Sequence, residues 1–109
     1  MASEHGPISA EALQALREAV RLAPDNVPLR QHLAQTLLGS GYLEEAEREY
    51  RHLLTMAPND EHLKLGLASA FYQQNKNSHA LVIVEDLVNT SKAPARAHLL
   101  HARLAYRAG

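Results

Sequence analysis

Apolar side chains recur along the chain every three or four residues, which is the spacing of an α-helix. The segment 43–57 shows this clearly, because its apolar positions fall on one side of a helix and glutamate or arginine occupies most of the others. Glycine, proline and asparagine interrupt the pattern at short intervals and mark the turns. The sequence therefore predicts six helices, over residues 9–23, 27–40, 43–57, 60–74, 78–90 and 94–108.

The pattern repeats at an interval of 34 residues. Two rows of alanine recur at this spacing: Ala12, Ala46 and Ala80, and Ala34, Ala68 and Ala102. A third row holds Gly41, Asn75 and Gly109, which are residue types that tolerate the left-handed backbone at a helix end. A fixed interval of this length is typical of stacked helical hairpins.

Short polar side chains stand before four of the predicted helices, where an oxygen can accept hydrogen bonds from the free amides of the first turn. We expect these N-caps to be Ser9, Asn26, Asn59 and Asn77.

The fifth predicted helix has more apolar residues than one buried stripe requires. Val82, Ile83 and Val88 are the surplus, so we expect part of this surface to be exposed, or to be covered by a partner or, in preference, by a segment outside this sequence. The run 81–84 also fits a short buried strand, but its place in the repeat favours a helix.

This arrangement resembles the tetratricopeptide repeat family, a helix–turn–helix of 34 residues. The first full unit, 27–60, carries the family positions Leu33-Ala34, Leu37, Gly41, Leu43, Ala46, Tyr50, Leu53 and Pro58. The second, 61–94, carries Leu67-Ala68, Phe71, Ala80, Val84 and Leu87, with Lys92 where the family has proline. The alternative is an unrelated helical bundle whose self-similarity is accidental.

The resemblance implies an all-α, right-handed α-solenoid of antiparallel helix pairs. A flexible tail, 1–7, would precede a repeat domain, 8–109, made of a half unit 8–26, full units 27–60 and 61–94, and a half unit 95–109. His98 and His101 replace apolar residues in the last half unit, so the pattern does not define the rotation of its helix. Because the sequence ends within a unit, we expect it to be part of a longer protein.

The resemblance further implies that the first helices of the units form a concave wall that binds a peptide or a partner helix. Carried over residue by residue, the exposed positions of this wall are Gln31, Gln35, Leu38, His62, Leu65, Ser69, Tyr72, Gln73, Arg96, Leu99, Leu100, Arg103 and Tyr106. Tyrosine and arginine are common at the centres of binding surfaces. The alternative for each position is a solvated helix face without a ligand.

Chaperone-binding members of the family hold a terminal carboxylate with lysine, asparagine and arginine. The corresponding positions here are Gln31, Gln35, Gly66, Arg96 and Leu100. Only Arg96 fits, so we do not expect this type of carboxylate clamp.

Charge is distributed unevenly along the chain. Residues 1–61 carry five basic and ten acidic residues, whereas residues 62–109 carry six basic and two acidic ones, and no acid follows Asp86. This asymmetry suits an acidic partner or weak head-to-tail association between copies. The explanation that we favour is that downstream helices supply the complementary acids. The net charge of −1 argues against a nucleic-acid partner.

Catalytic and metal-binding signals are weak. The chain has no cysteine, no HExxH sequence and no glycine-rich phosphate loop. His98 and His101 lie three residues apart with no carboxylate near the pair, His62 is a possible third ligand, and a zinc site needs three or four ligands. We therefore expect no metal, no cofactor and no catalytic residue.

No apolar run approaches the ~20 residues of a membrane span, and the first residues lack a signal-peptide pattern. These features favour a cytoplasmic protein that does not enter a membrane. We interpret the chain as a non-catalytic module for protein–protein interaction. The alternative is an adaptor, regulatory or oligomerisation segment at the N-terminus of a larger enzyme such as an ATPase.

Overall fold

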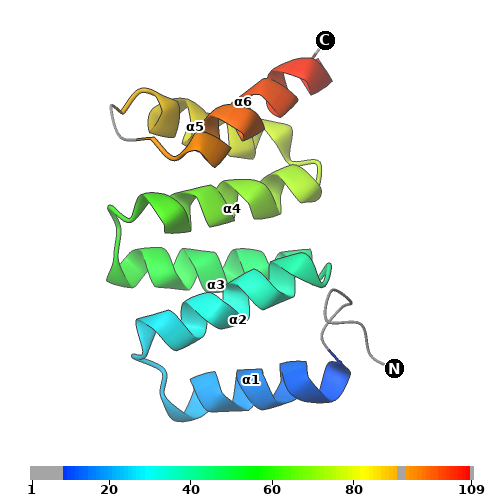
Figure 1. Cartoon of the computed structure of the whole chain (residues 1–109), viewed down its shortest axis with the longest axis vertical. Helices are drawn as coiled ribbons and strands as arrows, with labels where there is room; N and C mark the ends of the chain where they lie inside the picture. The colour runs from blue at the N-terminus through cyan, green and yellow to red at the C-terminus, as the bar shows by residue number, and fades with distance from the viewer. Residues whose placement is uncertain (1–8, 91–92, 109) are drawn as a thin grey trace.

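The computed structural model describes residues 9–90 and 93–108, which form six α-helices and no strand (Figure 1). The helices are α1 (Ala10–Leu22), α2 (Val27–Gly39), α3 (Leu43–Met56), α4 (Glu61–Gln73), α5 (Asn77–Val88) and α6 (Ala95–Ala108). The six predicted helices are confirmed to within one or two residues at each end. The predicted tail, 1–7, lies outside the described residues, as does Gly109.

The helices are stacked in chain order, and each packs against its neighbours in the sequence (Figure 1). Helices α2, α4 and α6 also contact one another in succession, so the first helix of each predicted unit belongs to one layer. Helices α1, α3 and α5 form the other layer. This is the predicted all-α helical repeat solenoid, and the run 81–84 is helical within it.

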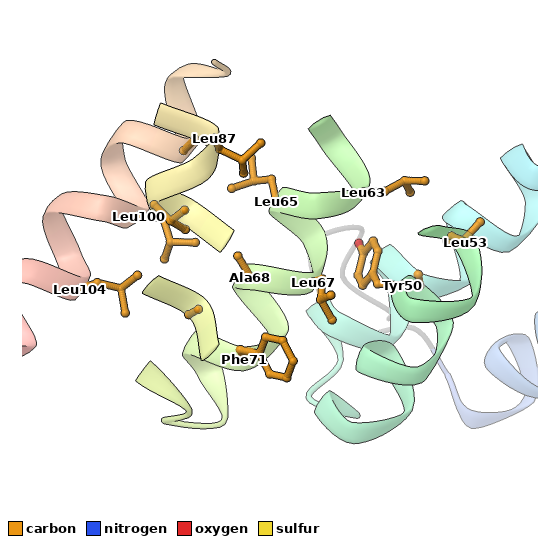
Figure 2. Close-up of a cluster of buried hydrophobic side chains, with 14 residues drawn as sticks. Tyr50, Leu53, Leu63, Leu65, Leu67, Ala68, Phe71, Leu87, Leu100 and Leu104 are labelled. Carbon is orange, nitrogen blue, oxygen red and sulfur yellow. The ribbon is translucent and has the colours of Figure 1, made fainter. Parts of the chain in front are cut away.

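Alanine is placed where paired helices cross. Ala34 and Ala46 in the first unit, like Ala68 and Ala80 in the second, are completely buried. Leucine and aromatic side chains fill the space on either side of these crossings (Figure 2). Because paired helices lie only ~8–10 Å apart, the crossing positions have no room for a larger side chain.

The two outermost members of the alanine rows behave differently. Ala12 in α1 and Ala102 in α6 are exposed, although they share the register of the buried alanines. Among the described helices, α1 packs only on α2, and α6 packs only on α5 and α4. Sequence register alone therefore does not predict burial at the ends of the stack.

Two of the four predicted N-caps are confirmed. The side chains of Ser9 and Asn26 accept hydrogen bonds from the amides of Ala12 and Leu29. The prediction of Asn59 is wrong, because Asp60 stands one residue nearer the first turn and accepts from His62 and Leu63.

The prediction of Asn77 as an N-cap is also wrong. Asn77 is the first residue of α5, and its side-chain oxygen accepts instead from Arg107 at 2.9 Å. The predicted left-handed turn residues Gly41 and Asn75 are confirmed, with φ angles of 87° and 62°.

The apolar surplus of α5 is only partly exposed. Val82 is 71% exposed, as expected for a side chain outside the buried stripe. Ile83 and Val88 are half-buried against the main core cluster. Val82 alone thus confirms the expected exposed apolar surface.

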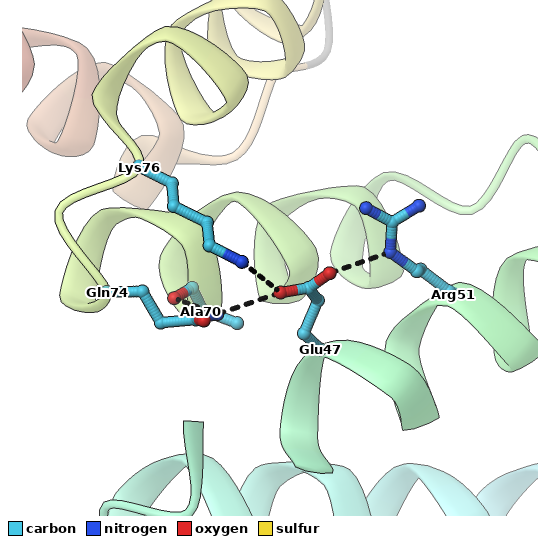
Figure 3. Close-up of polar contacts among 5 residues, drawn as sticks. All are labelled: Glu47, Arg51, Ala70, Gln74 and Lys76. Carbon is cyan, nitrogen blue, oxygen red and sulfur yellow. Dashed lines mark hydrogen bonds and ion pairs between the residues drawn. The ribbon is translucent and has the colours of Figure 1, made fainter. Parts of the chain in front are cut away.

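A polar cluster around Glu47 connects the two full units (Figure 3). One carboxylate oxygen accepts from Gln74 at 3.0 Å and Lys76 at 3.2 Å, and the other accepts from Arg51 at 2.9 Å. Burial raises the pKa of Glu47, but the hydrogen bonds from these three side chains outweigh it and hold the pKa below its ordinary value. The ionised carboxylate therefore fastens α3 to the turn between α4 and α5.

Candidate functional site

The main depression, which we call the central groove, has a volume of about 490 Å³. It crosses the layer of first helices and is also reached by one residue of α3. The side chains and glycines that line it are Gln35, Leu38, Gly39, Tyr50, His62, Leu65, Gly66, Ser69, Gln73, Pro94 and Arg96. An open groove lined by both polar and apolar residues suits an extended chain better than a small enclosed ligand.

Seven of the predicted wall residues lie together in this groove: Gln35, Leu38, His62, Leu65, Ser69, Gln73 and Arg96. Tyr72, Arg103 and Tyr106 line a separate depression, and Gln31 and Leu99 line neither. The structure therefore divides the predicted wall into two surfaces rather than one continuous one.

Two wall residues are not exposed as expected. Leu65 is 5% exposed and Leu100 is 6% exposed, and both belong to the main core cluster. Figure 2 shows Leu65 beside Leu87 of α5, with Leu100 of α6 on the same side of α4. The reason is that α6 packs on both α4 and α5, and so closes over positions that a single helix pair would leave open. Leu65 remains part of the groove floor.

The second depression lies along α6 and is lined by Tyr72, Ala102, Arg103, Tyr106 and Arg107. The Arg107 guanidinium lies 3.6 Å from the centre of the Tyr72 ring and donates to the Tyr72 carbonyl at 2.8 Å. Tyr72 is half-buried, whereas Tyr106 is 89% exposed. An uncovered aromatic ring beside two arginines makes this a secondary candidate surface.

Tyr50 and Gly66 are groove residues that the sequence analysis did not assign to the site. Tyr50 belongs to α3, in the other layer, but its ring lies against the backbone of α4 at Gly66. A Cβ atom on Gly66 would come within 2.2 Å of the Tyr50 ring. The absence of a side chain at Gly66 is therefore what lets the ring reach the groove.

The sequence does hold a signal for this contact, in the sizes of the residues at the next junction between units. One repeat later, the positions of Tyr50 and Gly66 are occupied by Val84 and Leu100, both of which are buried in the same cluster. A large residue facing a glycine is thus replaced by a medium residue facing a leucine. The space between a second helix and the following first helix is filled in both cases.

The electrostatics of the groove favour a negatively charged ligand. Among the described lining residues, Arg96 is a cation and none is a carboxylate. Burial raises the pKa of Tyr50 to about 12, against the opposite influence of the Arg96 charge. The phenol therefore stays protonated at neutral pH and remains a hydrogen-bond donor.

Within residues 9–90 and 93–108, no three histidine or acidic side chains are placed to hold a metal ion, and this includes the predicted candidates His62, His98 and His101. None of the described helices combines the length and the apolar character needed to cross a membrane.

Comparison with known proteins agrees with the geometry. The family described as tetratricopeptide repeat matches the chain twice, over residues 9–61 and 38–104. Together the two matches cover almost all of the described residues, and the chain belongs to this family of protein-interaction modules. A search of curated proteins found no match to the chain.

Proposed function

We propose that this chain is a non-catalytic interaction module whose central groove binds an acidic peptide segment of another protein. The observation that carries the proposal is the composition of the groove. Gln35, Ser69 and Gln73 offer hydrogen bonds to a peptide backbone, and Arg96 supplies a positive charge with no described carboxylate beside it in the lining. Membership of a family of protein-interaction modules supports the same conclusion.

Selection of peptides from a random displayed library tests this proposal directly. Peptides that bind the 109-residue chain are expected to be enriched in aspartate and glutamate. Ser69→Trp fills the groove and should abolish their binding. Thr55→Trp places the same side chain on an exposed position of α3 outside the groove lining and should leave binding unchanged.

Thermal unfolding of both variants by circular dichroism shows whether each is folded. Selected peptides that bind Ser69→Trp as well as the parent chain would contradict the groove as the binding site. Enrichment of basic peptides would contradict its proposed preference for acidic ligands.

A further inference from the structure

The Tyr50 ring is buried, but the residue is one of those that line the central groove. Only 3% of the residue is exposed. Buried tyrosine hydroxyls usually find a partner, because desolvating a polar group without compensation is unfavourable. Because Tyr50 lines the groove, a ligand bound there can act as the partner of its hydroxyl.

The groove provides access to this donor. Tyr50 is one of the residues that line the groove, and Figure 2 shows its oxygen turned toward α4. The oxygen is also not among the fully enclosed, unpartnered side-chain atoms of the described residues, whereas Arg30 Nε is. A ligand in the groove can therefore reach the hydroxyl, although the ring around it is enclosed.

The residues around the Tyr50 hydroxyl indicate which kind of acceptor it would bind. Arg96 is close enough to influence the ionisation of Tyr50, and both line the same groove. A hydroxyl donor beside a positive charge binds an anionic oxygen more strongly than a neutral one, because charge-assisted hydrogen bonds are roughly twice as strong. Carboxylates are the anionic oxygen groups of an unmodified peptide.

We propose that the Tyr50 hydroxyl donates a hydrogen bond to a carboxylate of the bound peptide at the floor of the central groove, with Arg96 as the opposing charge. This rests on the proposed function, and it adds a specificity residue from α3 to a wall otherwise built from first helices. Gly66 is the positioning residue, because it leaves the gap through which the phenol reaches the groove.

The test is a nuclear magnetic resonance titration of the ¹⁵N-labelled chain with three tripeptides. The first has a central glutamate between alanines and is blocked at both ends. The second replaces the glutamate with glutamine, and the third is all-alanine with a free C-terminal carboxylate. We expect the amide signals of Gly66 and Ser69 to shift and saturate with a carboxylate peptide and to respond at least tenfold more weakly to the glutamine peptide.

Comparing the first and third peptides identifies whether the carboxylate comes from a side chain or from a chain end. Tyr50→Phe keeps the ring against Gly66 and removes only the oxygen, so it should stay folded and bind the carboxylate peptide about tenfold more weakly. Arg96→Gln should weaken the same binding. Tyr42→Phe removes the hydroxyl of a tyrosine that is 48% exposed and outside the groove lining, and should have no effect.

Equal binding of the glutamate and glutamine peptides would overturn the proposal, as would unchanged affinity in Tyr50→Phe. In both cases the shifts at Gly66 and Ser69 would still support peptide binding in the groove. If no tripeptide shifts those signals, the carboxylate contact is also rejected, and the library selection with Ser69→Trp decides separately whether longer peptides use the groove.

Discussion

The contact between Tyr50 and Gly66 gives a sharp test of the packing. Replacing a glycine inside a helix with alanine normally stabilises a protein by about 1 kcal/mol, because alanine is the better helix former. At Gly66 the added Cβ would lie 2.2, 2.4 and 2.8 Å from three atoms of the Tyr50 ring. The ring must move out of a fully packed core, and overpacking of this kind costs up to about 3 kcal/mol. We therefore expect Gly66→Ala to destabilise the chain by about 2 kcal/mol.

For a chain of this size, such a change corresponds to a fall in Tm of about 10 °C, measured by circular dichroism. Gly39→Ala is the matched control. Gly39 is the last residue of α2 and also lines the groove, but an added Cβ there meets no other atom within 4 Å. This variant should be as stable as the parent chain or slightly more so.

A double-mutant cycle separates the clash from any general effect of changing α4. In a Tyr50→Leu background the ring is absent, so Gly66→Ala should become stabilising by about 1 kcal/mol. The reasoning is refuted if Gly66→Ala stabilises the parent chain as an ordinary helical glycine would, or if its effect is the same with and without the tyrosine ring.

Three further predictions concern the rest of the stack. Because the folded-state pKa of Glu47 is lowered, its contribution to stability is present above its ordinary pKa of 4.5 and lost as the pH falls through the folded value. Urea unfolding of Glu47→Gln should accordingly show less loss of stability in that acidic range than the parent chain. Ala46→Leu should cost about 1–3 kcal/mol or more at a closed helix crossing, whereas Ala12→Leu, at the open equivalent, should be nearly neutral in the same assay. Arg107→Ala should destabilise by about 0.5–1 kcal/mol through loss of its stacking on Tyr72, and Arg107→Lys should recover only part of this; identical midpoints for all three proteins would contradict a role for the stacking.

Helix positions and the repeat could be predicted from sequence because both depend on local information. An apolar stripe with helical spacing can be buried in only one way, and turn residues such as Gly41 and Asn75 adopt a backbone that few other residues tolerate. The alanine rows were informative for the same reason wherever both halves of a helix pair are described.

Burial in the last helix could not be predicted in this way. Leu100 was expected on the exposed wall by transferring the register of the preceding unit, but the packing of α6 on both α4 and α5 buries it. The exposure of Ala12 and Ala102 likewise depends on which neighbours are present rather than on the residues themselves.

The candidate site was predictable only in part. Residues of the wall such as Ser69 and Gln73 follow from their place on a first helix. The contribution of Tyr50 does not, because the repeat pattern marks it as an ordinary core aromatic. The signal is the combined size of Tyr50 and Gly66, which are 16 positions apart, compared with the combined size of the same pair one repeat later. This comparison indicates that the Tyr50 ring passes beside a glycine.

The difference in side-chain size between the two junctions has a consequence for the surface of the groove. The two junctions between units differ at this pair of positions, with Tyr50 and Gly66 at one and Val84 and Leu100 at the other. Transplanting the pair, by Val84→Tyr together with Leu100→Gly, would install the same donor one unit along. A pair of positions in the packed seam between units can thus decide whether a hydroxyl faces the groove, without any change to the exposed residues of the first helices.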